Sequence, residues 1–224
     1  MAKSATKTRQ AKGGARKEAA CGGGFRIGIM GGTFDPIHYG HLLAAEQARC
    51  KFNLDRVVFV PTGDAPHKTA RTQARPEYRY LMTVLATAAN PFFSVSRTEI
   101  DRKGPSYSID TIKYFLEHYE DRNPEVFFIT GLDAVMEILS WSKPDEILRL
   151  STIIAATRPG YDSAKLKKNV GSKIYSQIEL IQVSALAISS TDIRHRIANE
   201  QPIKYLLPDS VEQFIYKYKL YQNS

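Results

Sequence analysis

Cysteine is nearly absent from this chain of 224 residues, which contains only Cys21 and Cys50. Two cysteines do not indicate a disulfide framework, so we expect a protein of the reducing cytoplasm. Long apolar runs are missing as well, because no window approaches the roughly 18 apolar residues of a membrane-spanning helix. The sequence therefore argues against a disulfide-rich secreted scaffold, and it predicts no association with a membrane.

Acidic residues are scarce in the first 24 positions, where Glu18 is the single acid beside six lysines and arginines. This stretch has no apolar periodicity, so we predict a disordered basic tail over residues 1–24. The net charge of +8 belongs mostly to the tail, since the rest of the chain has 25 basic and 22 acidic residues. We therefore expect no specific nucleic-acid partner and place a single domain in residues 25–224. A transit peptide is the alternative for the tail.

Short β-rich runs alternate with helical stretches along the rest of the chain. Runs typical of strands occupy residues 26–30, 57–60, 92–95, 126–129, 152–155 and 178–183. Helical patterns occupy residues 39–52, 76–89, 107–120, 133–150, 191–199 and a last stretch from Ser210. One apolar helical stripe is assigned to the core and consists of Ile112, Phe115, Leu116 and Tyr119. This alternation predicts an α/β fold with a doubly wound parallel sheet, in which ligands bind at the carboxyl ends of the strands.

A turn with two glycines and two histidines follows the first predicted strand. Its sequence is Gly31-Gly32-Thr33-Phe34-Asp35-Pro36-Ile37-His38-Tyr39-Gly40-His41. The glycines allow the main chain close to a ligand, and the N–H groups of a helix start attract anions. His38 and His41 are three residues apart, so they share one side of the first helical turn and can reach the same ligand. We expect a phosphate; the alternatives are a metal pair and a buried helix start with incidental histidines.

A run of hydroxyl side chains precedes a helical pattern near the other end of the chain, in Ile188-Ser189-Ser190-Thr191-Asp192-Ile193-Arg194. Hydroxyl groups commonly cap helix starts, and capping alone would explain this run. Arg194 lies one turn further and can direct several N–H donors toward a phosphate at the helix start. The residues of this segment by themselves leave capping and phosphate binding open.

Together the two segments resemble the signature motifs of the nucleotidylyltransferase superfamily with the (H/T)xGH motif, whose closing motif is ISSTxxR. The resemblance implies a Rossmann-like fold in which both segments hold the phosphates of ATP, and it implies catalytic roles for His38, His41 and Arg194. The implied ATP-binding residues are Gly31, Gly32, Thr33, Phe34, His41, Gly131, Asp133, Arg158, Ile188, Ser189, Ser190, Thr191 and Arg194. For Asp133, a helix N-cap is the alternative to a ribose contact.

The residues between the two motifs resemble the bacterial nicotinate-nucleotide adenylyltransferases in particular. The matching segments are Pro66-His67-Lys68, Arg97-Thr98-Glu99-Ile100, residues 104–111, and Gly131-Leu132-Asp133 followed by Trp141. A nicotinate ring is flat and carries a carboxylate, so its site needs an aromatic platform and anion donors. The implied site for nicotinate mononucleotide consists of Thr33, Lys68, Ser106, Tyr107, Ser108 and Trp141. The alternatives are a core indole for Trp141, an N-cap for Ser106 and a solvated side chain for Lys68.

The resemblance implies an enzyme of NAD biosynthesis that transfers the adenylyl group of ATP to nicotinate mononucleotide and releases pyrophosphate. Mg²⁺ is the expected cofactor; it arrives with ATP, and we expect no protein ligand for it. Nicotinamide mononucleotide and phosphopantetheine are alternative substrates, and a cytidylyltransferase is a further rival. A non-catalytic nucleotide sensor is the alternative from another class. A homodimer is the default expectation for the oligomeric state.

Overall fold

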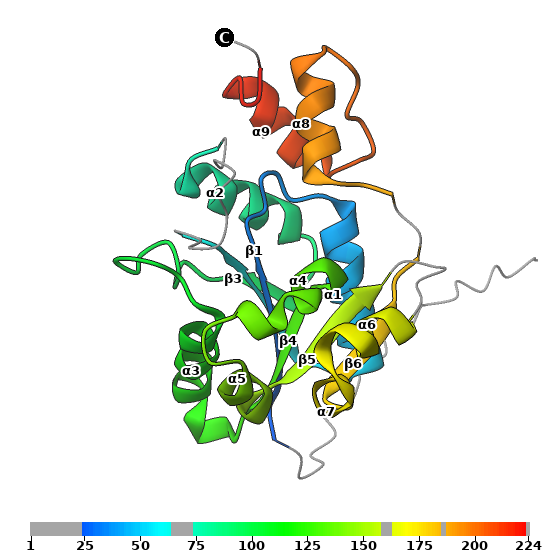
Figure 1. Ribbon diagram of the computed structural model, residues 1–224. Helices are drawn as coiled ribbons and strands as arrows, with labels where there is room; N and C mark the ends of the chain where they lie inside the picture. The colour runs from blue at the N-terminus through cyan, green and yellow to red at the C-terminus, as the bar shows by residue number, and fades with distance from the viewer. Residues whose placement is uncertain (1–23, 64–73, 158–162, 185–186, 223–224) are drawn as a thin grey trace, which may run out of the picture.

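The computed structural model describes residues 24–63, 74–157, 163–184 and 187–222, and a six-stranded sheet forms its centre (Figure 1). The strands are β1 (Arg26–Gly32), β2 (Arg56–Pro61), β3 (Phe93–Val95), β4 (Glu125–Gly131), β5 (Thr152–Thr157) and β6 (Ile178–Gln182). All neighbouring strands are parallel, in the order β3-β2-β1-β4-β5-β6. The predicted α/β fold with a doubly wound parallel sheet is confirmed, and each predicted strand is present.

The strand order reverses at β1, which pairs with β2 on one side and with β4 on the other. At such a point the connections leave the sheet in opposite directions, and a crevice forms outside the carboxyl ends of the strands. Gly31 in β1 pairs with Val60 in β2, and Gly131 in β4 pairs with Ala156 in β5. The two glycine segments that the sequence singles out therefore end at the same rim of the sheet.

Helices cover both faces of the sheet, because successive side chains of a strand point to opposite sides. In β1, Met30 belongs to the core cluster of one face, and Ile27 and Ile29 belong to that of the other. The helices that pack with Met30 are α1 (Tyr39–Lys51), α2 (Pro76–Thr87), α8 (Ser190–Ala198) and α9 (Asp209–Lys217). The helices of the opposite face are α3 (Ser108–His118), α4 (Leu132–Met136), α5 (Pro144–Leu150) and α6 (Ser163–Val170). The stripe of Ile112, Phe115, Leu116 and Tyr119 packs into this second cluster, which confirms its predicted role.

The helix predicted over residues 133–150 is wrong as a single element. The structure divides it into α4, a 3₁₀ turn η2 (Ile138–Ser140) and α5. Trp141 has extended backbone, and Lys143 takes a left-handed conformation with φ of 53° just before Pro144 begins α5. Proline fits the first turn of a helix but not its interior, so the chain must turn before that residue. The short helices α6 and α7 (Ser172–Tyr175) between β5 and β6 are additions that the sequence pattern does not predict.

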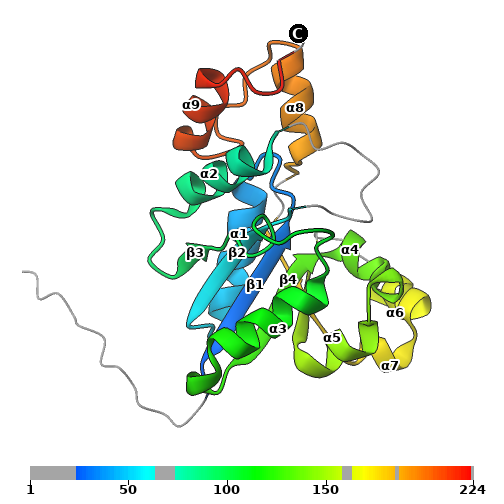
Figure 2. The same ribbon diagram turned by 90° about the vertical axis from the view of Figure 1, so that its left-hand side faces the viewer.

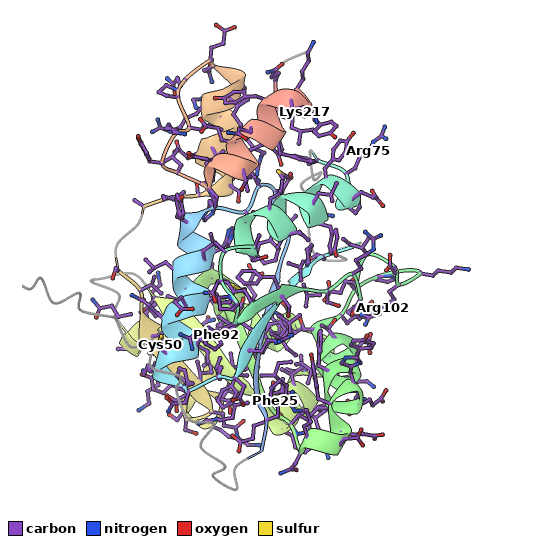
Figure 3. The ribbon with its side chains drawn as sticks, turned by 180° about the vertical axis from the view of Figure 1, so that it is seen from behind. Phe25, Cys50, Arg75, Phe92, Arg102 and Lys217 are labelled. Atoms are coloured by element: carbon purple, nitrogen blue, oxygen red, sulfur yellow. The ribbon has the colours of Figure 1, made fainter. Side chains whose placement is uncertain are left out.

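The last helix, α9, docks on α2. Val211 and Ile215 are buried in the shared core, and the rings of Tyr78 and Tyr218 lie 5.3 Å apart. Figure 2 shows α8 and α9 beside α2 at one end of the molecule, and Figure 3 shows Lys217 at the end of α9. This packing returns the C-terminal end of the chain toward the loop that follows β1.

Three further expectations from the sequence concern membrane helices, the two cysteines and the basic tail. Within the described ranges, no helix is long and apolar enough to span a membrane. Cys50 is exposed on α1, whereas Cys21 lies outside the described residues. The predicted basic tail also lies outside them except for Gly24, so its disorder stays a prediction.

Candidate active site

A pocket of about 360 Å³ opens at the carboxyl ends of β1, β4 and β5. Its lining comes from the glycine turn after β1, the start of α1, the ends of the neighbouring strands and the segment before α8. The predicted site residues in this lining are Gly31, Gly32, Phe34, His38, His41, Gly131, Ile188, Ser189 and Ser190. Segments from the two ends of the domain thus contribute to one cavity, at the rim where the sequence predicts ligand binding.

Side chains have little room at the two glycines that lead into the turn after β1. A Cβ on Gly32 would lie 2.8 Å from the Phe34 ring, and one on Gly31 would lie 3.3 Å from Phe128. Phe34 takes a left-handed backbone conformation with φ of 51°, and its side chain is buried. Its ring meets the His41 ring edge-on, with the centroids 5.1 Å apart. The turn therefore fixes the aromatic wall against which His41 rests.

The two histidines lie together at the start of α1, as their spacing predicts. His38 is the N-cap residue, and its ring stacks on the His41 ring with the centroids 3.8 Å apart. The backbone N–H of His38 donates to Nδ1 of His41 at 3.3 Å. In the neutral ring of His41 the proton is then on Nε2, which can donate to an anion. A Cβ on Gly40 would lie 3.0 Å from the His38 ring, so this glycine keeps the stack in place.

The hydroxyl run before α8 serves both as a helix cap and as a tie to the glycine turn. Oγ of Ser189 accepts a hydrogen bond from the backbone N–H of Asp192 at 3.1 Å, which is an N-cap bond. Oγ of Ser190 donates to the carbonyl oxygen of Pro36 at 2.9 Å, across 154 positions of sequence. Capping is therefore present, and it places the start of α8 directly against the loop after β1.

Arg194 adds a second tie between the two motifs. Its Nη1 donates to the carbonyl oxygen of Asp35 at 2.7 Å, and its Nη2 donates to Oγ1 of Thr191 at 3.3 Å. These contacts use two of the five N–H donors of a guanidinium group. The backbone of the loop after β1 thus holds the Arg194 side chain beside the glycine turn. Its remaining N–H groups can donate to a bound anion.

Arg79 is a residue of this region that sequence reasoning missed. It belongs to α2 and is fully buried, with donor bonds to the carbonyl oxygens of Thr33 at 2.7 Å, Ala74 at 3.2 Å and Gly63 at 3.5 Å. Burial lowers the pKa of its guanidinium group, and the nearby Asp35 carboxylate opposes that effect. Arg79 therefore fastens the loop after β1 to the loop after β2. An arginine inside a helical pattern is usually solvated, so the sequence gives no signal for this role.

The loop before α3 carries the residues that the resemblance assigns to the nicotinate carboxylate. Tyr107 is the N-cap residue of α3 and Ser108 is its first residue, so the N-cap alternative for Ser106 is wrong. Ser106 is buried, and its Oγ donates to the carbonyl oxygen of Glu99 at 3.4 Å. None of the described residues that line the 360 Å³ pocket comes from this loop. It forms a separate helix start at the same rim of the sheet.

Glu99 connects this loop to α3 through hydrogen bonds. Its carboxylate is buried and accepts a hydrogen bond from Oγ1 of Thr111 on α3 at 2.7 Å. A Cβ on Gly63 would lie 2.2 Å from the Glu99 carbonyl oxygen, so the loop after β2 crosses it closely. Burial raises the pKa of Glu99, and the Thr111 hydroxyl and the Arg102 charge partly oppose that rise. Figure 3 shows Arg102 on the connection between β3 and α3.

Trp141 and Asp133 follow β4, on the face of the sheet that α3 covers. The Trp141 ring is half-buried and meets the Phe128 ring edge-on, with the centroids 5.8 Å apart. The core alternative is therefore present in part, since Trp141 packs against the second core cluster. Asp133 is exposed in the first turn of α4, whose N-cap residue is Gly131, so the N-cap alternative for Asp133 is wrong.

Two predicted site residues, Lys68 and Arg158, lie outside the described residues. Conversely, the pocket has lining residues that sequence reasoning missed, namely Met30, Gly40, Ala44, Thr130, Ala156, Thr157, Val183 and Ser184. Most of them are small or apolar and resemble ordinary core residues in the sequence. Their position at strand ends, in a fold of this class, is the signal that could have identified them.

Comparison with known proteins finds a family and named relatives. The model of the cytidylyltransferase-like family matches residues 29–196. A probable nicotinate-nucleotide adenylyltransferase from Thermoanaerobacter sp. (strain X514) is 54% identical over 200 residues, which cover 88% of this chain and 94% of that protein. A probable nicotinate-nucleotide adenylyltransferase from Moorella thermoacetica is 54% identical over 202 residues, which cover 88% of this chain and 92% of that protein.

Solved structures share the fold of this chain. The Plasmodium falciparum nicotinic acid mononucleotide adenylyltransferase complexed with NaAD matches with a TM-score of 0.70 and 21% identity, over 88% of this chain and 97% of the other. The same Plasmodium falciparum protein complexed with APC matches with a TM-score of 0.65 and 22% identity, over 88% and 96% of the two chains. At these identities the likeness establishes the fold alone.

Proposed function

This chain belongs to the nicotinate-nucleotide adenylyltransferases within the cytidylyltransferase-like family, and we propose that it transfers the adenylyl group of ATP to nicotinate mononucleotide. The products are nicotinate adenine dinucleotide and pyrophosphate, which makes the protein an enzyme of NAD biosynthesis. The observation that carries the proposal is the direct union of the two signature motifs, through Ser190 to Pro36 and through Arg194 to Asp35.

The united motifs supply the donors that a triphosphate requires. The pocket is lined by the glycine turn, by His41 and by the start of α8. N–H groups at a helix start, an imidazole N–H and a guanidinium group all bind phosphate oxygens. We assign to the ATP site the residues Gly31, Gly32, Thr33, Phe34, His41, Gly131, Asp133, Arg158, Ile188, Ser189, Ser190, Thr191 and Arg194.

In the reaction, a phosphate oxygen of the mononucleotide forms a bond to the α-phosphorus of ATP, and the bond from that phosphorus to the bridging oxygen of pyrophosphate breaks. The attacking phosphate is already anionic at neutral pH, so no strong base is needed. Catalysis comes from positioning the two substrates and from neutralising charge that grows on the transferred group and on pyrophosphate. Nε2 of His41 donates to the α-phosphoryl oxygens, His38 holds its ring, and Arg194 binds the leaving phosphates.

The mononucleotide binds on the adjacent part of the rim. The N–H groups of Tyr107 and Ser108 at the start of α3 take the nicotinate carboxylate, and Trp141 provides the aromatic platform for the ring. Lys68, Thr33 and Ser106 complete this site. Support comes from Glu99, whose buried carboxylate and carbonyl oxygen fasten both α3 and the loop before it.

Mg²⁺ is the proposed cofactor and supplies charge neutralisation on the triphosphate. The described residues that line the pocket include histidine and hydroxyl side chains but no carboxylate. This lining fits an ion that is held by ATP oxygens and water rather than by a protein cage. A cytoplasmic location and a homodimer complete the proposal, and gel filtration with light scattering tests the latter.

The decisive experiment measures pyrophosphate release from ATP and Mg²⁺ with nicotinate mononucleotide, nicotinamide mononucleotide or phosphopantetheine as the second substrate. We expect the highest kcat/KM with nicotinate mononucleotide, because helix-start N–H groups favour a carboxylate over an amide. A preference for either alternative substrate contradicts the proposed acceptor. ATP binding without turnover of any acceptor supports the nucleotide sensor, and CTP in place of ATP tests the cytidylyltransferase rival.

A further inference from the structure

Tyr221 lies one residue before the end of the described chain, and its side chain returns to the loop after β1. Its hydroxyl donates to Oδ1 of Asp35 at 2.7 Å, across 186 positions of sequence. The ring of Tyr221 packs against the core cluster that α1, α2, α8 and α9 share. The C-terminal segment thus reaches the same loop that carries the glycine turn.

Asp35 connects this segment to the candidate catalytic machinery. The side chain is 5% exposed, and its Oδ1 also accepts from the backbone N–H of Ala74 at 3.2 Å. The carbonyl oxygen of the same residue accepts from Nη1 of Arg194 at 2.7 Å. Asp35 therefore links the two residues: its side chain accepts from Tyr221, and its backbone carbonyl oxygen accepts from Arg194. A movement of Asp35 would also shift the acceptor of the Arg194 hydrogen bond.

The surroundings of the Tyr221 hydroxyl keep it a hydrogen-bond donor. Burial raises the pKa of the phenol, the Asp35 carboxylate raises it further, and the charges of Arg194 and Arg79 oppose these effects. The phenol therefore stays protonated at neutral pH. Arg79 also acts on Asp35 and holds the Thr33 carbonyl oxygen. Buried Arg79 of α2 and half-buried Tyr221, which follows α9, thus converge on the loop after β1.

We propose that Tyr221 is a positioning residue for adenylyl transfer, which holds Asp35 so that Arg194 and the glycine turn stay aligned for phosphate binding. This inference rests on the proposed function. The Tyr221 hydroxyl donates to the Asp35 carboxylate, so Tyr221 acts through Asp35. Without its hydroxyl, the buried carboxylate loses one of its hydrogen-bond donors, and the side chain of Asp35 is held less firmly. The backbone carbonyl group of Asp35, to which Arg194 donates, is then less well fixed.

The test uses Tyr221→Phe, which keeps the ring and removes only the hydroxyl. We expect kcat to fall about tenfold, because a small misplacement of a catalytic group is costly. KM for nicotinate mononucleotide should stay within about twofold, since that site uses other loops. Tyr218→Phe is the matched control, because it makes the same change on an exposed ring three residues away. A kcat of Tyr221→Phe within about twofold of the parent overturns the inference.

Two further measurements separate positioning from a general loss of stability. In an Arg194→Lys background, Tyr221→Phe should lower kcat by less than about threefold, because the group through which it acts is already changed. Equal loss in both backgrounds overturns the inference. Amide hydrogen exchange of residues 33–37 should accelerate in Tyr221→Phe and not in Tyr218→Phe, and unchanged exchange there overturns it too. The exchange measurement does not depend on enzyme activity. A parent protein without activity would contradict the proposed function, and the exchange rates would still test whether Tyr221 holds the loop.

Discussion

His41→Ala removes the donor that the proposed mechanism places on the α-phosphoryl group. His41 accepts from the His38 backbone through Nδ1, so Nε2 is the atom that carries the donor proton. Loss of one preorganised transition-state donor lowers kcat about 10²–10³-fold, or roughly 2.7–4 kcal/mol. We expect His41→Ala to lose at least about 10²-fold in kcat.

The structural cost of the same substitution is smaller. The His41 ring stacks on His38 at 3.8 Å and meets Phe34 edge-on at 5.1 Å. Aromatic contacts of this kind contribute about 0.5–1.5 kcal/mol each, so the folded state should persist at assay temperature. The loss of activity therefore exceeds what the loss of these contacts can explain.

The assay is steady-state pyrophosphate release with both substrates saturating, with the Tm of each variant measured in the same buffer. His195→Ala is the matched control, because His195 is exposed on α8 and should keep parental kcat. A folded His41→Ala variant with kcat within about threefold of the parent would refute the assignment. Such a result would mean that main-chain N–H groups and Arg194 bind the phosphates without His41.

Three further changes probe other parts of the rim. Trp141→Ala should raise KM for nicotinate mononucleotide about tenfold through lost ring stacking, and an unchanged KM removes Trp141 from the site. Because burial raises the pKa of Glu99, the parent loses stability as pH rises above the ordinary glutamate pKa of about 4.3. The Tm of Glu99→Gln relative to the parent should therefore increase with pH, and a constant difference contradicts this. Gly40→Ala places a Cβ 3.0 Å from the His38 ring, so kcat should fall about tenfold, and parental kcat would show that the histidine stack tolerates displacement.

Much of the fold is predictable from the sequence, because strand and helix patterns alternate clearly and the motifs follow the strands. The pairing of His38 with His41 also follows from local spacing, and the structure stacks their rings. The break in the helix predicted over 133–150 is less visible, since the apolar pattern continues across it. Pro144 is the local signal that argues for a new helix start there.

The residues that fasten the site are the part that sequence reasoning could not supply. Arg79 is fully buried although it stands in a helical pattern, and Tyr221 donates to a carboxylate 186 positions away. Burial and long-range partners depend on how α2 and α9 dock, and no local pattern encodes that. The roles of the candidate catalytic and binding residues stay predictions, although the pocket brings most of the phosphate-binding set together.

The ties between the loop after β1 and the start of α8 have a consequence for synthesis of the chain. Ser190 and Arg194 reach Pro36 and Asp35 across 154 and 159 positions, so the phosphate pocket consists of contacts between early and late segments. A growing chain can contain all six strands of the sheet before it contains Ser190 and Arg194. Contacts of such sequence separation are slow to form, because loop-closure entropy opposes them. We therefore expect nucleotide binding to begin only when Ser190 and Arg194 are present, so shorter chains would not sequester ATP.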